Sequence, residues 1–291
     1  MLPFFVWYHV VMKRYHLLII DPQNDFCDMP LDATAPHAPA LPVPGAHQDM
    51  LRLASLIELG GTGLADITVT LDSHHRYDVA HPTFWYTAEG TAPAPFTPIA
   101  AADVRAGRFQ PRDAKALPRV LSYLDALEAA GRYQLMVWPV HCEIGSWGHN
   151  VHDAVRAAYN AWEEERHAVV AKVGKGANPW TEHYSAVMAE VPDPADPGSQ
   201  LNRELIGSLA PADTIYIAGE AGSHCVKATT EHIADQIDPR KLVLVSDCMS
   251  PVPGFEAQYL EFAQAMQRRG ARLATSGDVL REWLSNAEHQ A

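Results

Sequence analysis

Short apolar runs alternate with amphipathic segments along most of the chain. Six of these runs are continuously apolar rather than alternating, which is typical of strands buried on both faces of a sheet. The runs cover residues 15–20, 66–71, 133–138, 167–173, 214–219 and 241–246. Helical patterns lie between them, over residues 46–59, 118–130, 149–164, 200–208, 224–236 and 255–268. This order predicts an α/β fold with a doubly wound, mostly parallel six-stranded sheet and helices on both faces.

Two segments interrupt the alternation and are predicted to be long loop insertions. Residues 28–45 are rich in proline and alanine, and residues 82–118 hold several prolines with little periodicity. Long loops inside compact domains are usually functional or disordered, so 82–118 is a candidate lid or oligomer contact. We expect residues 15–291 to form one domain. Residues 1–14 are either an N-terminal arm or contain a misassigned start, with translation beginning at Met12.

Composition narrows the class of partner. The 291 residues include 35 acidic and 22 basic side chains, and the formal net charge of −13 disfavours nucleic acid or an anionic membrane as the partner. The apolar start is shorter than the ~18 residues that a membrane span requires. Four cysteines are too few for a disulfide framework in a chain of this length, so we expect free thiols and a cytoplasmic protein.

In sheets of this kind the ligand binds beyond the carboxyl ends of the strands, so the residues that follow each strand are the candidates for chemistry. Asp21 follows the first strand, within DPQNDF. Burial there can raise the pKa of its carboxyl group toward the range of a general base. An isolated aspartate in such a place is more often part of an Asx turn or a helix cap.

Cys225 follows the fifth strand and opens a helix after the segment GEAGSH. The positive end of the helix dipole and nearby cations would lower the pKa of its thiol and favour the thiolate. Amides of the first helical turn would also stabilise an oxyanion. The alternative is a buried, inert cysteine, which is the role we assign to Cys27, Cys142 and Cys248.

A lysine and a group of potential metal ligands complete the set of candidates. Lys175 lies between glycines after the fourth strand, where its charge could stabilise a thiolate and a carboxylate; Lys172 is the competing candidate. The potential ligands are Asp72, His74, His81 and His141, with His75 as a possible substitute for His74. A carboxylate with imidazoles suits a divalent ion such as Zn, Fe or Mn, although a lone histidine is more often an ordinary surface or core residue.

Together, and in this order along the chain, these motifs resemble the nicotinamidase and isochorismatase-like superfamily of cysteine hydrolases. The resemblance extends from Tyr15 to about Ala274. It implies a catalytic triad of Asp21, Lys175 and Cys225, and it implies the metal set of one aspartate and three histidines that marks nicotinamidases. It also implies a substrate ring held by Phe26, Trp138 and Tyr184, an oxyanion site at the amides of Ala221 and Cys225, and a cis peptide before Ala221.

The reaction implied by the resemblance is hydrolysis of nicotinamide to nicotinate and ammonia through a thioester on Cys225, with a metal and no organic cofactor. A small carboxamide would be the partner, in a homo-oligomer. The long 82–118 segment and the spacing of His81 depart from the family pattern and put the substrate in question. The alternatives are another small carboxamide, a ureido or carbamoyl amide, or isochorismate on the same fold. An alternative of another class is a non-catalytic metal-binding or redox-sensing protein.

Overall fold

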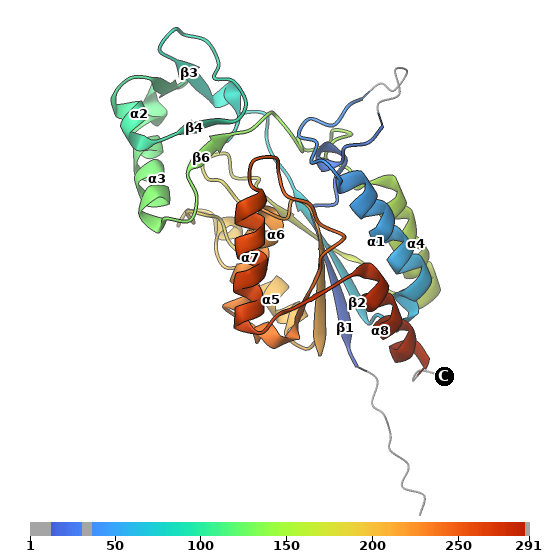
Figure 1. The fold of residues 1–291 in the computed structure, drawn as a ribbon. Helices are drawn as coiled ribbons and strands as arrows, with labels where there is room; N and C mark the ends of the chain where they lie inside the picture. The colour runs from blue at the N-terminus through green and yellow to red at the C-terminus, as the bar shows by residue number, and fades with distance from the viewer. Residues whose placement is uncertain (1–12, 31–36, 289–291) are drawn as a thin grey trace, which may run out of the picture.

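A six-stranded parallel sheet forms the centre of the computed structural model, which describes residues 13–30 and 37–288 (Figure 1). Its strands are β1 (Tyr15–Ile20), β2 (Asp66–Asp72), β7 (Ala171–Lys175), β8 (Thr214–Gly219), β9 (Leu242–Val245) and β10 (Arg272–Ala274). They lie in the order β10-β9-β8-β1-β2-β7, and every neighbouring pair is parallel. The predicted arm before residue 13 lies outside the described residues.

Helices cover both faces of this sheet, as predicted. One face carries α1 (Ala46–Gly60), α4 (Asp153–Arg166) and α8 (Ser276–Glu288), and the other carries α5 (Arg203–Leu209), α6 (Cys225–Ala234) and α7 (Glu256–Arg269) (Figure 1). Within β1, Leu18 and Ile20 join the hydrophobic core on one face and Leu17 and Ile19 join the core on the other. Burial on both faces is the reason for the continuously apolar strands.

The segment after β2 is more ordered than its proline content predicts. It contains β3 (Trp85–Thr87), β4 (Thr97–Ile99), α2 (Ala101–Arg105), β5 (Phe109–Pro111), α3 (Leu117–Ala130) and β6 (Leu135–Val137). β3 pairs with β5 and β4 pairs with β6, both antiparallel. These elements gather at one end of the molecule, beside the main sheet (Figure 1). The prediction of a loop without secondary structure over 82–118 is therefore wrong.

The prediction that residues 133–138 form a strand of the main sheet is also wrong. Only Leu135–Val137 are extended, and they pair with β4 in the small antiparallel sheet. The sixth strand of the main sheet is instead β10, which pairs with β9 and has only one buried residue, Ala274. A three-residue strand with so little burial produces no apolar run, and an apolar run does not reveal which strand it pairs with.

Several boundaries also differ from the predicted ones. α4 continues to Arg166 and ends where His167 adopts φ +50°, so β7 begins at Ala171 rather than at residue 167. α8 was not predicted at all. Short 3-10 turns cover Asn24–Phe26, Gly61–Gly63, Pro82–Phe84, Ala114–Ala116, Pro197–Ser199 and Pro239–Lys241. Over the described residues, no helix is long and apolar enough to cross a membrane.

Candidate active site

Four segments bring their polar side chains to the carboxyl edge of the central strands. Asp21 follows β1, Asp72 ends β2, Lys175 ends β7, and Cys225 begins α6 after β8. The register places Asp72 directly opposite Lys175 on the neighbouring strand. Because parallel strands end at the same edge, residues more than 200 positions apart in the chain, Asp21 and Cys225, reach one place.

Lys175 is the centre of this group. Its Nζ atom lies 3.0 Å from Asp21 Oδ2 and 2.8 Å from Asp72 Oδ1, and 3.6 Å from the sulfur of Cys225. All of these side chains are buried. Lys172, the competing candidate, lies at the surface and contacts Glu163 instead. The structure therefore brings Asp21, Lys175 and Cys225 together and leaves Lys172 apart from them.

The charges of this cluster depend on one another. Burial alone would lower the pKa of Lys175, but Asp21 and Asp72 outweigh it and hold that pKa well above its usual value, so the lysine stays cationic. Burial raises the pKa of the Asp21 carboxyl group, and Lys175 opposes this. The pKa of the Cys225 thiol is likewise raised well above its usual value by burial, despite Lys175.

The sequence predicts a lowered pKa for the Cys225 thiol because it opens a helix, but in the structure this pKa is raised. The thiol does begin α6, but burial, Asp21 and Asp72 raise its pKa by more than Lys175 lowers it. The resting side chain is therefore a thiol. A nucleophile in this state needs an adjacent base to take its proton, and Asp21 lies beside the same lysine.

The backbone holds Asp21 in a fixed orientation. Its φ of +44° lies in the left-handed region, which is uncommon for residues other than glycine. The hydroxyl of Thr70 on β2 donates a 2.6 Å hydrogen bond to Asp21 Oδ1 and accepts one from the amide of Asp21. Thr70 is fully buried. This pair of hydrogen bonds ties the carboxylate to the neighbouring strand.

The turn before Cys225 has the geometry that the resemblance implies. The peptide bond between Glu220 and Ala221 is cis. The amides of His224 and Val226 donate to the carbonyl of Ala221. Within the described part of the chain, the amides of Ala221 and Cys225 have no such backbone partner. Two free amides thus lie next to the sulfur in sequence, as an oxyanion site requires.

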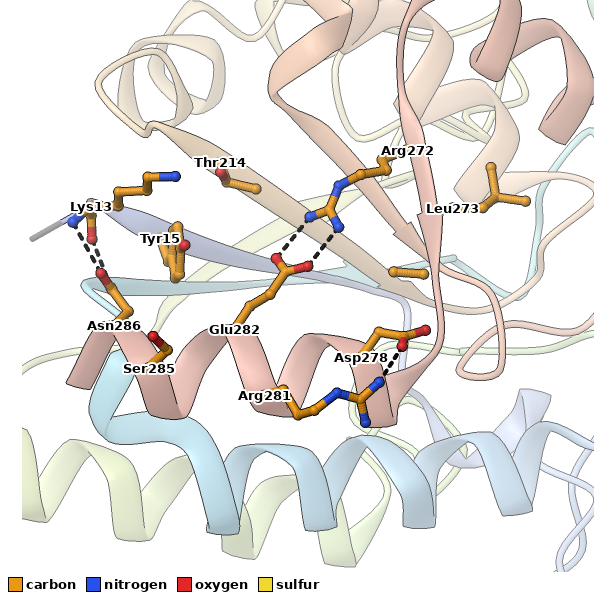
Figure 2. Close-up of a pocket in the computed structure, with 11 residues that line it drawn as sticks. Lys13, Tyr15, Thr214, Arg272, Leu273, Asp278, Arg281, Glu282, Ser285 and Asn286 are labelled. Carbon is orange, nitrogen blue, oxygen red and sulfur yellow. Dashed lines mark hydrogen bonds and ion pairs between the residues drawn. The ribbon is translucent and has the colours of Figure 1, made fainter. Parts of the chain in front are cut away.

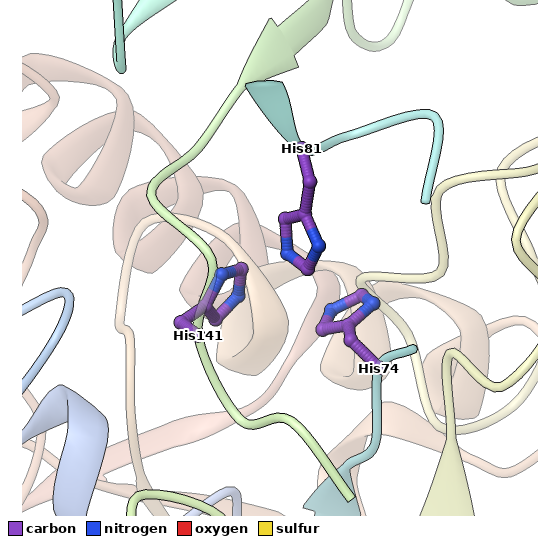
Figure 3. A group of neighbouring side chains, drawn as sticks. All are labelled: His74, His81 and His141. Atoms are coloured by element: carbon purple, nitrogen blue, oxygen red, sulfur yellow. The ribbon is translucent and has the colours of Figure 1, made fainter. Parts of the chain in front are cut away.

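Three buried histidines lie close together (Figure 3), and two of them contact Asp72 of this cluster. Ligand atoms of His74, His81 and His141 lie within 4.8 Å of one another. Each ring is anchored through Nδ1: His74 to Asp78 Oδ2 at 3.2 Å, His81 to the carbonyl of His75 at 3.2 Å, and His141 to the carbonyl of Pro139 at 2.8 Å. Such anchoring is typical of histidines that bind a metal through the other nitrogen.

The donor set of these histidines fits a divalent ion. Nε2 of His81 is buried without a hydrogen-bond partner. A buried nitrogen of this kind is costly unless something binds it, and three imidazoles are a common donor set for zinc. The side chain of His75 is exposed, so it does not substitute for His74.

Asp72 lies between the histidines and the lysine. Its Oδ2 atom is 3.1 Å from Nε2 of His74 and 3.3 Å from Nε2 of His141, while Oδ1 binds Lys175. His74, His141 and Lys175 together hold the pKa of this carboxyl well below its usual range, against the effect of burial. One carboxylate thus joins the histidine group to the group around Cys225.

A small aromatic pocket opens onto the sulfur of Cys225. Its volume is about 20 Å³. The lining residues are Phe26, Leu41, Asp72, Trp138, His141, Glu182, Tyr184, Ala221, His224, Cys225 and Val252. Nε1 of Trp138 donates to the hydroxyl of Tyr184 at 3.1 Å. The three aromatic residues expected around a substrate ring therefore line the same pocket.

Sequence reasoning missed two polar residues of this pocket, Glu182 and His224. His224 precedes Cys225 and packs edge-on against Trp138, with ring centroids 5.2 Å apart. Its place next to the cysteine was the available signal. Glu182 lies two residues before Tyr184 on a segment without regular structure, and no local pattern marks it.

A much larger hollow, about 950 Å³, lies at the opposite edge of the sheet, between α8 and the amino ends of β1, β8 and β10 (Figure 2). Its arginine and acidic side chains are paired with one another. Arg272 forms two hydrogen bonds with Glu282, Arg281 pairs with Asp278, and Asn286 binds the backbone of Lys13. We therefore assign the chemistry to the small pocket at Cys225 rather than to the larger hollow.

No protein-family model matches the sequence, and no curated protein is similar to it in sequence. Solved structures do match the fold. The Acinetobacter baumanii nicotinamidase pyrazinamidase has a TM-score of 0.60 at 18% identity, covering 92% of this chain and 98% of its own. The yeast nicotinamidase bound to the inhibitor nicotinaldehyde has a TM-score of 0.61 at 18% identity, covering 90% and 99%. An isochorismatase-like hydrolase from Alkaliphilus metalliredigens has a TM-score of 0.50 at 15% identity, covering 93% and 99%.

The similarity extends over about nine-tenths of the chain, and the identities are low. It shows that this protein has the isochorismatase-like hydrolase fold, which nicotinamidases share. Fold alone does not specify a substrate, because one fold hosts many reactions.

Proposed function

We propose that this protein is a metal-containing cysteine amidohydrolase of the nicotinamidase type, which hydrolyses nicotinamide to nicotinate and ammonia. The observation that carries the proposal is the buried cluster of Cys225, Lys175 and Asp21, in which the lysine ammonium lies 3.6 Å from the sulfur and 3.0 Å from the carboxylate. A thiol, a base and a fixed cation at the mouth of an aromatic pocket are suited to acyl transfer.

The reaction begins with proton transfer from the Cys225 thiol to Asp21. The sulfur then attacks the carboxamide carbon, and the developing oxyanion accepts hydrogen bonds from the amides of Ala221 and Cys225. Asp21 returns the proton to the leaving nitrogen, ammonia departs, and a thioester remains on Cys225. Lys175 stays charged throughout, because its neighbours raise its pKa, and it stabilises the anionic partner of each step.

The second half of the reaction uses the same residues. Asp21 takes a proton from water, the hydroxide attacks the thioester carbon, and the oxyanion again lies at the two amides. Collapse of this intermediate breaks the carbon–sulfur bond and releases the carboxylic acid, and Asp21 returns the proton taken from water to the sulfur, which restores the thiol. Phe26, Trp138 and Tyr184 hold the ring so that the carbonyl carbon stays near the sulfur.

The histidines that fit a divalent ion would hold it together with Asp72. His74, His81 and His141 supply imidazole nitrogens, and Zn, Fe and Mn all accept this donor set. When bound, the ion would coordinate the ring nitrogen of the substrate and so orient the ring. We further propose that the protein works in the cytoplasm, since all four cysteines are free thiols. The proposal that it forms a homo-oligomer rests on the resemblance to the family alone.

The test is ammonia release from nicotinamide by the metal-replete protein, with Cys225→Ala as the inactive variant and Cys248→Ala as the matched control. Cys248 is also buried and follows a strand, but it lies outside the pocket. Release that depends on Cys225 alone supports the proposal. Turnover of another carboxamide, a ureido amide or isochorismate instead would keep the nucleophile and replace the substrate, whereas no turnover would favour a non-catalytic metal-binding or redox-sensing role.

A further inference from the structure

The pocket contains a carboxyl group that the reaction described above does not use. Glu182 lines the pocket together with Tyr184 and Trp138, and the residue is only 4% exposed. Its backbone is held on both sides, since its amide donates to the hydroxyl of Tyr123 and its carbonyl accepts from the amide of Glu190. The side chain therefore has a fixed starting point at the pocket wall.

Only one of the two carboxyl oxygens of Glu182 is satisfied. Oε1 accepts a 3.0 Å hydrogen bond from the amide of His183, while Oε2 is buried and has no partner. A buried carboxyl oxygen without a hydrogen bond is costly, and such groups in native proteins usually have a functional reason.

The position of Glu182 relates it to the substrate ring. It shares the pocket with Tyr184 and with His141 of the histidine group, and His74, Asp78 and Asp72 are the charged groups that act on its carboxyl. These groups belong to the histidine side of the pocket, and Cys225 is not among them although it lines the same pocket. A hydrogen-bonding group that meets it would belong to the ring and not to the scissile carboxamide.

We propose that Glu182 is a specificity-determining residue, whose free oxygen accepts a hydrogen bond from an N–H or O–H group on the substrate ring. The inference rests on the proposed amidase function and refines its substrate class: among cyclic carboxamides related to nicotinamide, those with a ring donor such as an amino or hydroxyl group are hydrolysed in preference to those without one. A site built around a buried acceptor discriminates against analogues that leave the acceptor unpaired.

The experiment compares nicotinamides that carry an amino group at each ring position with the matching methyl compounds, using the full-length, metal-replete protein. Amino and methyl groups have similar size, but only the amino group donates. At one ring position we expect kcat/KM to favour the amino compound by about tenfold or more, mainly through a lower KM. Glu182→Met should abolish this preference, and Glu182→Gln should keep part of it because the amide oxygen still accepts.

Glu190→Gln is the matched control. Glu190 is another carboxyl with a buried, unpartnered oxygen and a pKa raised by burial to about 7, but it does not line the pocket. Its variant should keep the wild-type preference. Thermal unfolding and metal content, measured on each variant, show whether the protein is folded and loaded, and binding of the amino and methyl compounds measured by calorimetry gives a second readout.

The outcomes separate this inference from the function on which it rests. Equal turnover of all amino and methyl compounds, or a preference that persists in Glu182→Met, overturns the role of Glu182 and leaves the amidase intact. Glu182→Met could also lose metal while the molecules that keep it still prefer the amino compound. This result overturns the role of Glu182 as well, since Glu182 would then affect turnover only through the histidines. Failure of every compound to react or bind overturns both proposals.

Discussion

At the residue scale, the side chains that we propose to react or to bind metal are oriented by neighbours outside the proposed reaction. Asp21 is held by the hydroxyl of Thr70, and the histidine rings are held through their Nδ1 atoms by Asp78 and by backbone carbonyls. These contacts fix directions as well as charges. Removing one should therefore alter catalysis or metal binding more than it alters the fold.

Thr70→Val tests the support of Asp21. The substitution keeps the shape of the side chain but removes the 2.6 Å hydrogen bond to Oδ1. We expect kcat to fall by about tenfold or more with little change in KM, because the proposed base, Asp21, is displaced while the pocket is intact. Steady-state kinetics check this. Thr68→Val is the control: Thr68 is buried on the same strand but bonds His16 instead, so its variant should keep kcat.

Removal of the metal tests the histidine group. Nε2 of His81 has no partner, so we expect the purified protein to contain a divalent ion and a chelator to lower its melting temperature. His81→Ala should reduce the metal content, measured by elemental analysis, and should abolish the effect of the chelator. His16→Asn serves as the comparison, because His16 is a buried histidine outside the group. A full metal content in His81→Ala would contradict the assignment.

At the scale of elements, close backbone contacts set how the helices pack on the sheet. The turn that follows α1 contacts α8 so closely that a Cβ on Gly63 would lie 2.1 Å from the carbonyl oxygen of Trp283. That atom belongs to the helix backbone and cannot rotate away. The small residue is thus what allows α8 to lie against α1.

Gly63→Ala should therefore be destabilising. Either the turn or α8 must shift, and we expect the free energy of unfolding to fall by about 1–3 kcal/mol. Gly207→Ala provides the opposite case, because Gly207 is an exposed residue of α5 with no atom near its missing Cβ. It should raise the free energy of unfolding by about 0.5–1 kcal/mol through helix propensity. Urea denaturation of both variants measures the two changes, and equal stabilities would refute the packing argument.

At the scale of the whole molecule, stability should depend on pH through buried groups remote from the candidate active site. His16 lies between β1 and β2, bonded to Thr68, and burial lowers its pKa from 6.5 to about 4. In this range the unfolded chain binds a proton that the folded protein does not. The contribution of His16 to the free energy of unfolding is therefore fully present above pH 6.5 and is lost as the pH falls toward about 4.

We expect the free energy of unfolding to fall by up to about 3 kcal/mol across that interval because of His16 alone. His16→Asn cannot titrate, so the difference between wild type and variant should shrink as the pH is lowered. Chemical denaturation at a series of pH values measures it. A difference that stays constant with pH would mean that His16 titrates normally in the folded protein. Burial raises the pKa of Glu190 to about 7, so its contribution to the free energy of unfolding decreases as the pH rises, opposite to that of His16. This contribution is the same in wild type and variant and cancels in the comparison.

How much the sequence predicts can be judged element by element. The strands β1, β2, β8 and β9 and the helices α1, α3, α6 and α7 lie close to their predicted positions, because each has strong periodicity and clear ends. β10 and α8 were not predicted, and residues 133–138 were placed in the wrong sheet. The extent of a single domain over 15–291 stays a prediction.

By itself, the sequence determined which side chains meet at the carboxyl edge. Asp21, Asp72, Lys175 and Cys225 each follow or end a strand, and parallel strands bring such positions together whatever their separation in the chain. Only the tertiary structure decided the charge state of Cys225, the division of Asp72 between the lysine and the histidines, and the presence of Glu182 in the pocket. The reason is physical: local sequence sets the backbone over a few residues, whereas burial, pKa and the lining of a pocket depend on all the groups that distant segments bring together.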